Sequence, residues 1–198
     1  MRRSALPLFL LTLGLFVACS NDPDDAGNLA EGNTSSGSVA GHTLVPASAL
    51  STPLEGGTAW VIISSQADVC ADRKGQTTRP NIDILTFQLG RAVDNEIAPL
   101  TPGEYDAAAV PGPGEVRAVE AEFNHVDDDC KATRPNDEEE ATSGSVTLTK
   151  VDLSDGGLIE GTFDLVFPPN GERLTGTFRA PVCNYEQPSV GEDWTCAP

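Results

Sequence analysis

Apolar and polar residues alternate with a period of two between residues 157 and 182. This period is typical of half-buried antiparallel strands, because successive side chains of a strand point to opposite faces. A turn cluster, Pro168-Pro169-Asn170-Gly171, divides the segment into two halves. We therefore predict a β-hairpin here. Gly161 and Gly176 lie on its apolar face, where they indicate either a bend or the close approach of a neighbouring strand or side chain.

Shorter runs of apolar and β-branched residues predict further strands, at residues 41–50, 58–65, 81–90, 103–110, 115–126 and 143–152. The apolar face of the third run changes between Ile84 and Leu85, which predicts a bulge. Pro46 cannot donate a ladder hydrogen bond, so the first run is expected at a sheet edge. The alanine-rich stretches 107–109 and 118–121 show no sustained period of 3.6 residues, so no helix is predicted there.

Seven or eight strands joined by short turns predict an all-β domain. Its architecture would be either an antiparallel sandwich or an up-and-down, calycin-like barrel. Successive hairpins along the chain favour a meander. Sandwich and barrel both remain open at this point, and they differ in their interior: a barrel would enclose a cavity, whereas a sandwich would be packed solid. Residues 41–198 are expected to form this one domain, since their number suits a single core.

The N-terminal segment has the pattern of an export signal. Arg2 and Arg3 precede an apolar run from Ala5 to Ala18. The run is shorter than the roughly 20 residues of a membrane-spanning helix, and its basic front end is typical of a secretory signal peptide. Its end, Phe16-Val17-Ala18-Cys19, resembles the lipobox of bacterial lipoproteins, although Phe16 stands where that family usually has an aliphatic residue.

The resemblance implies both a modification and an address. In this family the leader, here residues 1–18, is removed, and the cysteine, here Cys19, carries the acyl chains. Ser20 in place of aspartate implies onward transport to the outer membrane. Residues 19–40 are rich in Gly, Ser, Asn and Asp and have almost no bulky apolar side chains. We therefore expect a flexible linker between the lipid anchor and the domain.

The charge of the chain excludes some classes of partner. Acidic residues outnumber basic ones by 30 to 12, and the formal net charge is −18. Loss of Arg2 and Arg3 with the leader would change this charge to −20. Nucleic acids and anionic lipid surfaces need positive patches, so we expect no nucleic-acid partner. Contact with the membrane is expected only through the lipid.

Four further cysteines follow the one in the lipobox: Cys70, Cys130, Cys183 and Cys196. An even number of cysteines in an exported chain predicts two disulfides. Three pairings are possible, and the short separation of Cys183 from Cys196 favours their bridge, which leaves Cys70 for Cys130. A zinc site is the alternative. It is disfavoured because no C-x-x-C spacing occurs and the chain has only two histidines.

No motif in the sequence indicates catalysis. There is no G-x-S-x-G elbow and no glycine-rich phosphate loop in front of a helix. His42 lies beside the linker and His125 in an acidic region, so a Ser-His-Asp triad would be hard to assemble. An acid pair of the glycosidase type stays open, but 30 acidic residues make it unspecific. We expect a non-enzymatic protein without a cofactor.

An acidic segment, residues 123–140, contains the weak candidates for a metal site. His125 with Asp127, Asp128 and Asp129 could bind a divalent cation through oxygen ligands. Runs of like charge more often form solvated loops, and we therefore predict no metal site there.

The tetrapeptide Thr-Arg-Pro-Asn occurs at 78–81 and again at 133–136. Each copy follows a cysteine of the pair predicted between Cys70 and Cys130. If that bridge forms, Arg79 and Arg134 are expected on one rim of the domain, as a recognition site with two guanidinium groups. The alternative is that proline only sets an extended entry to a strand.

Together these features predict the following function. Beyond its lipobox, the chain resembles a loosely defined class of small, β-rich lipoproteins of Gram-negative bacteria, through its stapled loops and its "SGSVTLT" and "GTF" segments. That class implies location and fold but no activity. We expect a lipid-anchored outer-membrane protein that presents a β-domain for interaction or envelope structure. The alternative is a calycin-like barrel that carries a small apolar ligand.

Overall fold

The protein consists mostly of β-structure. The computed structural model describes residues 32–133, 140–185 and 195–197. The strands are β1 (Thr34–Gly37), β2 (Ser48–Pro53), β3 (Ala59–Ser64), β4 (Thr77–Thr78), β5 (Ile82–Val93), β6 (Glu96–Ile97), β7 (Gly103–Asp106), β8 (Glu115–Val126), β9 (Ser143–Val151), β10 (Leu158–Phe167), β11 (Glu172–Pro181) and β12 (Thr195–Cys196). The helical segments are α1 (Val69–Lys74) and a 3-10 turn at Glu55–Gly57. Neither helical segment in these ranges is long and apolar enough to cross a membrane.

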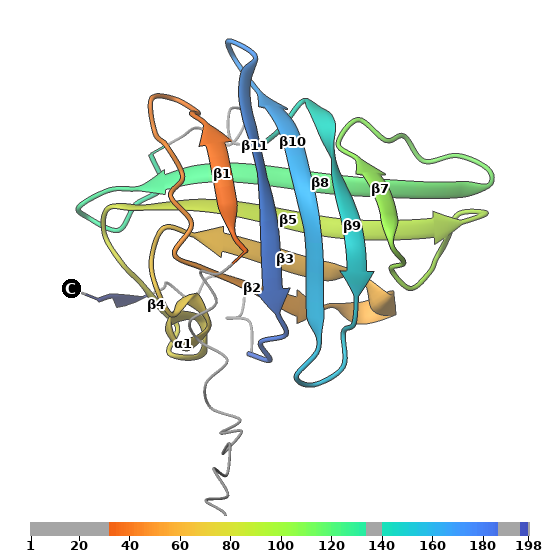
Figure 1. Ribbon diagram of the computed structural model, residues 1–198, viewed down its shortest axis with the longest axis horizontal. Coiled ribbons are helices and arrows are strands. Elements are labelled where there is room, and N and C mark those ends of the chain that lie inside the picture. The colour runs from red at the N-terminus through yellow and green to blue at the C-terminus, as the bar shows by residue number, and fades with distance from the viewer. Residues whose placement is uncertain (1–31, 134–139, 186–194, 198) are drawn as a thin grey trace, which may run out of the picture.

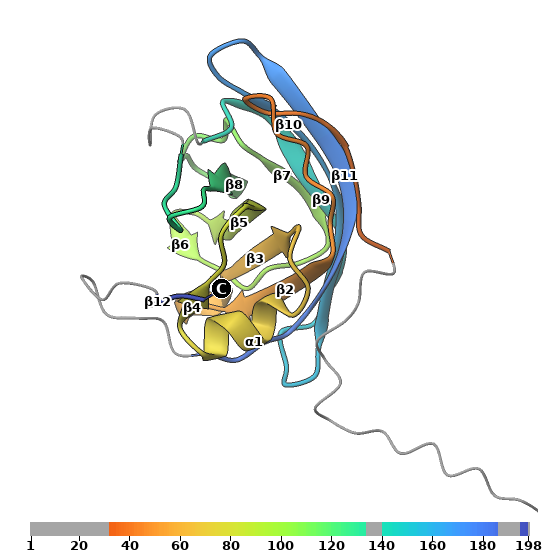
Figure 2. The same cartoon turned by 90° about the vertical axis from the view of Figure 1, so that its left-hand side faces the viewer.

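Ten strands form one curled sheet with the shape of a half-barrel. Their order is β1-β11-β10-β9-β7-β8-β5-β3-β2, and β6 pairs with β5. In Figure 1, the strands β1, β11, β10 and β9 stand upright in front of β8, β5, β3 and β2, which run crosswise behind them. Figure 2 shows the curved wall of β9, β10 and β11 from the side. The two remaining strands, β4 and β12, form a separate parallel pair.

The sheet consists of two meanders joined by one short strand. The antiparallel runs β2-β3-β5-β8 and β9-β10-β11 agree with the predicted hairpins. Between them, β7 pairs in parallel with β8 and antiparallel with β9. The far edges of the sheet also approach each other, because Ser51 of β2 forms a parallel bridge with Val182, just after β11. The count of strands exceeds the predicted seven or eight because four short strands, β1, β4, β6 and β12, are not predicted from the sequence.

Most of the predicted strands are confirmed. The hairpin is formed by β10 and β11 around the four turn residues 168–171. The bounds of β8 agree with the prediction of residues 115–126. The predicted run 41–50 is displaced, because the strand β2 begins only at Ser48, beyond Pro46, but it does lie at an edge. As expected, the stretches 107–109 and 118–121 are not helical.

The linker predicted over residues 19–40 is wrong in its last residues. β1 pairs antiparallel along β11, and the side-chain oxygen of Asn33 accepts a hydrogen bond from the backbone N–H of Arg179 at 2.7 Å. Val39 is fully buried. Strand pairing uses backbone groups, so the scarcity of bulky side chains, which favoured a linker, did not prevent it. The domain therefore begins before residue 41.

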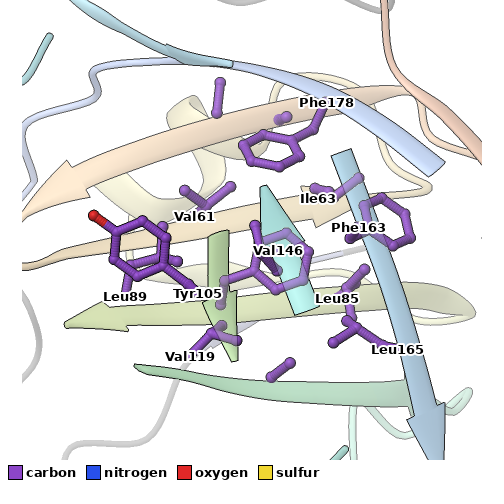
Figure 3. Close-up of a cluster of buried hydrophobic side chains, with 14 of the residues drawn as sticks. Val61, Ile63, Leu85, Leu89, Tyr105, Val119, Val146, Phe163, Leu165 and Phe178 are labelled. Carbon is purple, nitrogen blue, oxygen red and sulfur yellow. The ribbon is translucent and has the colours of Figure 1, made fainter. Parts of the chain in front are cut away.

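The concave face of the sheet is filled by apolar side chains from its two walls. One wall consists of β9, β10 and β11, and the other consists of β2, β3, β5 and β8. Figure 3 shows part of this core, with Val61, Leu85 and Leu89 opposite Phe163 and Phe178. The ring centroid of Phe87 in β5 lies 5.6 Å from that of Phe163 in β10 and 5.5 Å from that of Phe178 in β11. Such distances are those of packed aromatic pairs. The two walls are therefore in direct contact through their aromatic side chains.

A second, smaller cluster covers the outer face of the sheet. Leu50, Ile62 and Val69 are buried there, and Ile84 packs against them. The predicted bulge between Ile84 and Leu85 is therefore wrong, since β5 pairs with β3 and β8 without a register shift. Both faces of β5 are apolar at this point because α1 and its neighbours cover the outer one. No helix is predicted at α1 from the sequence, because its six residues are too few to show a helical period.

The two disulfides do not join the predicted partners. Cys70 in α1 is bonded to Cys183, and Cys130 is bonded to Cys196 in β12. The prediction relied on closeness along the chain. In the fold, Cys183 is buried in the cluster beneath α1, whereas Cys196 belongs to a strand that pairs with β4 (Thr77–Thr78). The four cysteines thus form two disulfides as expected, but in a different one of the three possible pairings.

The close approach predicted at the hairpin glycines is confirmed, and it gives a testable prediction. A Cβ on Gly176 would lie 2.0 Å from the carbonyl oxygen of Thr34 and 2.5 Å from the ring of Phe163. Gly176→Ala should therefore lower the free energy of unfolding by about 1–3 kcal/mol, because β1 or the ring must move. Chemical denaturation measures this loss. The control is Gly90→Ala in β5, where a Cβ meets nothing within 4 Å; equal losses in both variants would contradict the prediction.

Candidate functional site

The core-facing side chains of the neighbouring strands β5 and β8 are apolar along most of each strand and become polar at the same end of the strand pair. In β5, Asp83 continues the row of Leu85, Phe87 and Leu89, which are fully buried. In β8, the same alternation places His125 after the row of buried residues Val119, Ala121 and Phe123. Asp83 and His125 are directly opposite each other in the antiparallel register. The apolar core therefore ends in a carboxylate and an imidazole.

The second histidine of the chain lies against this pair. His42 is the last residue of the tight turn Val39–His42, in which the backbone groups of the two end residues hydrogen-bond to each other at 2.9 and 3.0 Å. Its Nδ1 lies 3.6 Å from Oδ1 of Asp83, and Nδ1 of His125 lies 2.9 Å from the same oxygen. The two imidazole rings are stacked, with centroids 3.9 Å apart and planes 19° apart. We call His42, Asp83 and His125 the histidine–aspartate cluster.

Hydrogen bonds of the backbone hold the cluster on rigid elements. The N–H of Asp83 donates to the hydroxyl of Ser65 at 2.8 Å, and the carbonyl of Asp83 accepts from the N–H of Ser65 at 3.0 Å. The carbonyl of His125 accepts both the N–H and the hydroxyl of Thr133. Only His42 stands on a turn, and its side chain is the most exposed of the three, at 37% against 17% and 18%.

The carboxylate of Asp83 has an unusual set of neighbours. Its side chain is only 17% exposed, and among the described residues no Lys or Arg forms an ion pair with it. A buried carboxylate is costly unless a positive or hydrogen-bonding partner faces it. Here the partners are two imidazoles, and imidazole is the commonest side-chain ligand for metal ions. The arrangement is therefore chemically capable of binding a cation.

The acidic residues singled out from the sequence do not form a site together. Oδ1 of Asp127 accepts the N–H groups of Asp129 and Lys131, both at 2.9 Å, and so closes its own turn. Oδ1 of Asp128 accepts a hydrogen bond from the side chain of Asn81. The carboxylate of Asp129 is exposed and lies 3.7 Å from the ammonium group of Lys131. These contacts are those of a solvated loop, and His125 points to Asp83 instead.

Of the two arginines predicted to form a recognition site, the structure describes only Arg79. The guanidinium of Arg79 donates to both carboxylate oxygens of Asp72 in α1, at 2.9 to 3.2 Å. This hydrogen-bonded ion pair raises the pKa of Arg79 above its ordinary value. Arg134 lies outside the described residues, and the bridge that was to bring both arginines together does not form. Arg79 therefore has a structural role, which is to hold α1 against the segment after it.

Cys19, the predicted site of lipidation, also lies outside the described residues.

The acidic segment of the sequence groups His125 with the aspartates that follow it, and the sequence analysis does not join it to Asp83. A signal for Asp83 and His125 was present, because each takes a core-facing position at the end of an alternating strand. No such signal exists for His42, since its place depends on how the segment between β1 and β2 crosses the end of the sheet.

A scan against protein-family models and searches of curated proteins and of solved structures found no match to this chain.

Proposed function

We propose that this chain is a lipid-anchored, non-enzymatic protein of the bacterial outer membrane, whose β-domain binds its partner through its outer surface. The observation that carries this proposal is the contact between the two walls of the half-barrel. Phe87 packs on Phe163 and Phe178, and Phe123 of β8 lies 6.2 Å from Phe167 of β10. These aromatic contacts fill the space between the two walls at these positions and so favour a packed interior over a ligand cavity. Binding on the outside is therefore favoured over the calycin-like carrier.

The cysteines support the export of the domain. Two disulfides are present, and structural disulfides form and persist in oxidising compartments such as the bacterial periplasm. This agrees with the export signal over residues 1–18 and with the lipobox cysteine at its end. The formal charge of −18 favours a solvated domain, without affinity for nucleic acid.

The lipid anchor is tested by acyl labelling in an expressing Gram-negative bacterium. We expect incorporation of labelled palmitate in the wild-type chain and its complete loss in Cys19→Ser, because only the thiol of Cys19 accepts the diacylglyceryl group in this class of protein. The variant should also leave the membrane fraction, since no other membrane contact is proposed. Ser20→Ala keeps the cysteine and serves as the control, which should stay labelled. Labelled Cys19→Ser would refute the anchor.

The mode of binding is tested by native mass spectrometry of the acylated protein, purified from the membrane fraction in detergent. A packed interior predicts the mass of the acylated chain without its leader, reduced by four hydrogens for the two disulfides. Additional mass of an apolar molecule that is lost on denaturation would favour the carrier instead.

A further inference from the structure

We propose that His42, Asp83 and His125 form a binding site for one divalent transition-metal ion, with zinc as the representative ion. This inference rests on the proposed function only in assigning the domain a binding role. It names the ligand of the histidine–aspartate cluster and departs from the expectation, drawn from the sequence, that no metal is bound.

The distances between the donor atoms suit a metal ion. One donor atom from each of the three residues can be chosen so that all lie within 4.8 Å of one another. Nitrogen and oxygen ligands bind zinc at about 2.1 Å, which places two ligands of a tetrahedral site roughly 3.4 Å apart. The separations of 2.9 and 3.6 Å between the Nδ1 atoms and Oδ1 of Asp83 lie on either side of this value. The three residues are therefore close enough to share one ion, once their rings are suitably oriented.

The charge around the cluster favours a cation. Asp83 is largely buried, and its only ion-pair partners among the described residues are the two imidazoles. An acidic turn adjoins it, since the N–H of Asn81 donates to the carbonyl of Asp127 and its side chain donates to Asp128. Oδ1 and Oδ2 of these loop aspartates carry negative charge, which raises the local concentration of cations. A dication held by the two imidazoles would compensate the negative charge of this carboxylate.

The donor set selects the class of metal. Calcium takes six to eight oxygen ligands and magnesium prefers carboxylates and water, whereas the cluster offers a single carboxylate. Imidazole nitrogens suit zinc, copper, nickel and iron. Three protein ligands leave the remaining coordination positions to water or to a partner molecule. A transition-metal ion is therefore the occupant that this chemistry recognises.

Binding requires one local rearrangement. The lone pair of an imidazole nitrogen lies in the plane of its ring, so two rings stacked with planes 19° apart cannot both direct lone pairs at one ion. His125 is held on β8, and its side chain is only 18% exposed. His42 is more exposed and ends a turn that contains Gly41, where an added Cβ would meet nothing within 4 Å. Its ring is therefore the freer of the two to rotate. We therefore expect the ring of His42 to turn away from the stack when the ion binds.

Zinc titration of the full chain, purified in mild detergent with a tag that contains no histidine, tests the site. Calorimetry should show one ion bound per chain in the wild type. His42→Ala, Asp83→Asn and His125→Ala should each weaken binding at least tenfold, since even changes in the residues behind metal ligands cost about 10- to 100-fold. Because the chain has only two histidines, nuclear magnetic resonance of their ring signals gives a direct readout: zinc should shift both sets, while magnesium should shift neither.

The control variant is Asp129→Asn, which removes an exposed carboxylate of the neighbouring loop that is outside the cluster. It should keep the affinity of the wild type. Affinity lowered equally by Asp129→Asn and by His42→Ala would indicate nonspecific binding to acidic loops and overturn the site. Ring signals that do not move with zinc would overturn it as well, even if a variant fails to fold. The lipid anchor is read from palmitate labelling, so either proposal can fail without the other.

Discussion

Replacing Phe87 by alanine should lower the free energy of unfolding by about 3–5 kcal/mol, the range of aromatic truncations in a packed core. Phe87 lies in the middle of β5 and is fully buried. Its ring contacts Phe163 and Phe178 from the opposite wall, with centroids 5.6 and 5.5 Å away. Truncation would open a cavity between two walls that are tied to the rest of the sheet, so neither wall can collapse into it.

The loss is measured by denaturation with urea, and Phe87→Leu is the matched control. Leucine keeps much of the buried volume and should cost less than about 1.5 kcal/mol with modest repacking. The contrast between the two variants tests the contact between walls that also carries the proposed function. A hollow interior would give small and similar losses for both, because a side chain that lines a cavity loses few contacts on truncation.

The second large effect is expected for the bridge between Cys70 and Cys183. The double variant Cys70→Ser/Cys183→Ser should lose about 2–5 kcal/mol, because the bridge closes a long loop with a sequence separation of 113. Cys183 is also buried beneath α1, and that helix has only six residues and little stability of its own. We expect α1 to become the first part of the domain to exchange its amide hydrogens.

The double variant Cys130→Ser/Cys196→Ser serves as the comparison. Its loop is shorter, with a sequence separation of 66, and the entropic difference between the two loops is about 0.5 kcal/mol. β12 and β4 are two-residue strands, so their separation should expose little core. Peptide mapping without reduction should link residue 70 to 183 and residue 130 to 196. A peptide that links 183 to 196 would contradict both the pairing and the order of the two effects.

Local patterns predicted the strands well because alternation is a property of neighbouring residues. The hairpin of residues 157–182 shows this, since its period, turn and glycines are all legible in a short stretch of sequence. The same reasoning failed where a face of a strand was covered by something distant in sequence. Ile84 suggested a bulge because its outward position is apolar, and the cause is α1, which packs on that face.

The lengths of elements also limited the prediction. β1 is a polar strand whose stability depends on hydrogen bonds to β11, some 140 residues later in the chain. Its composition is that of a linker, and only its partner makes it a strand. The shape of the curled sheet likewise depends on contacts between segments that are distant in the sequence. Alternation shows that one face of each strand is buried, but it does not show which strands form the opposite wall.

The sequence therefore establishes the all-β class, the hairpins, the oxidisable cysteines and the resemblance to an exported lipoprotein, because each depends on residue types at short spacing. Disulfide partners and the histidine–aspartate cluster depend on which distant segments meet. His42, Asp83 and His125 are about forty residues apart from one to the next, and they meet because β5 pairs with β8 while the segment after β1 crosses their ends. Contacts of that kind follow from the packing of the whole core, which no local pattern encodes.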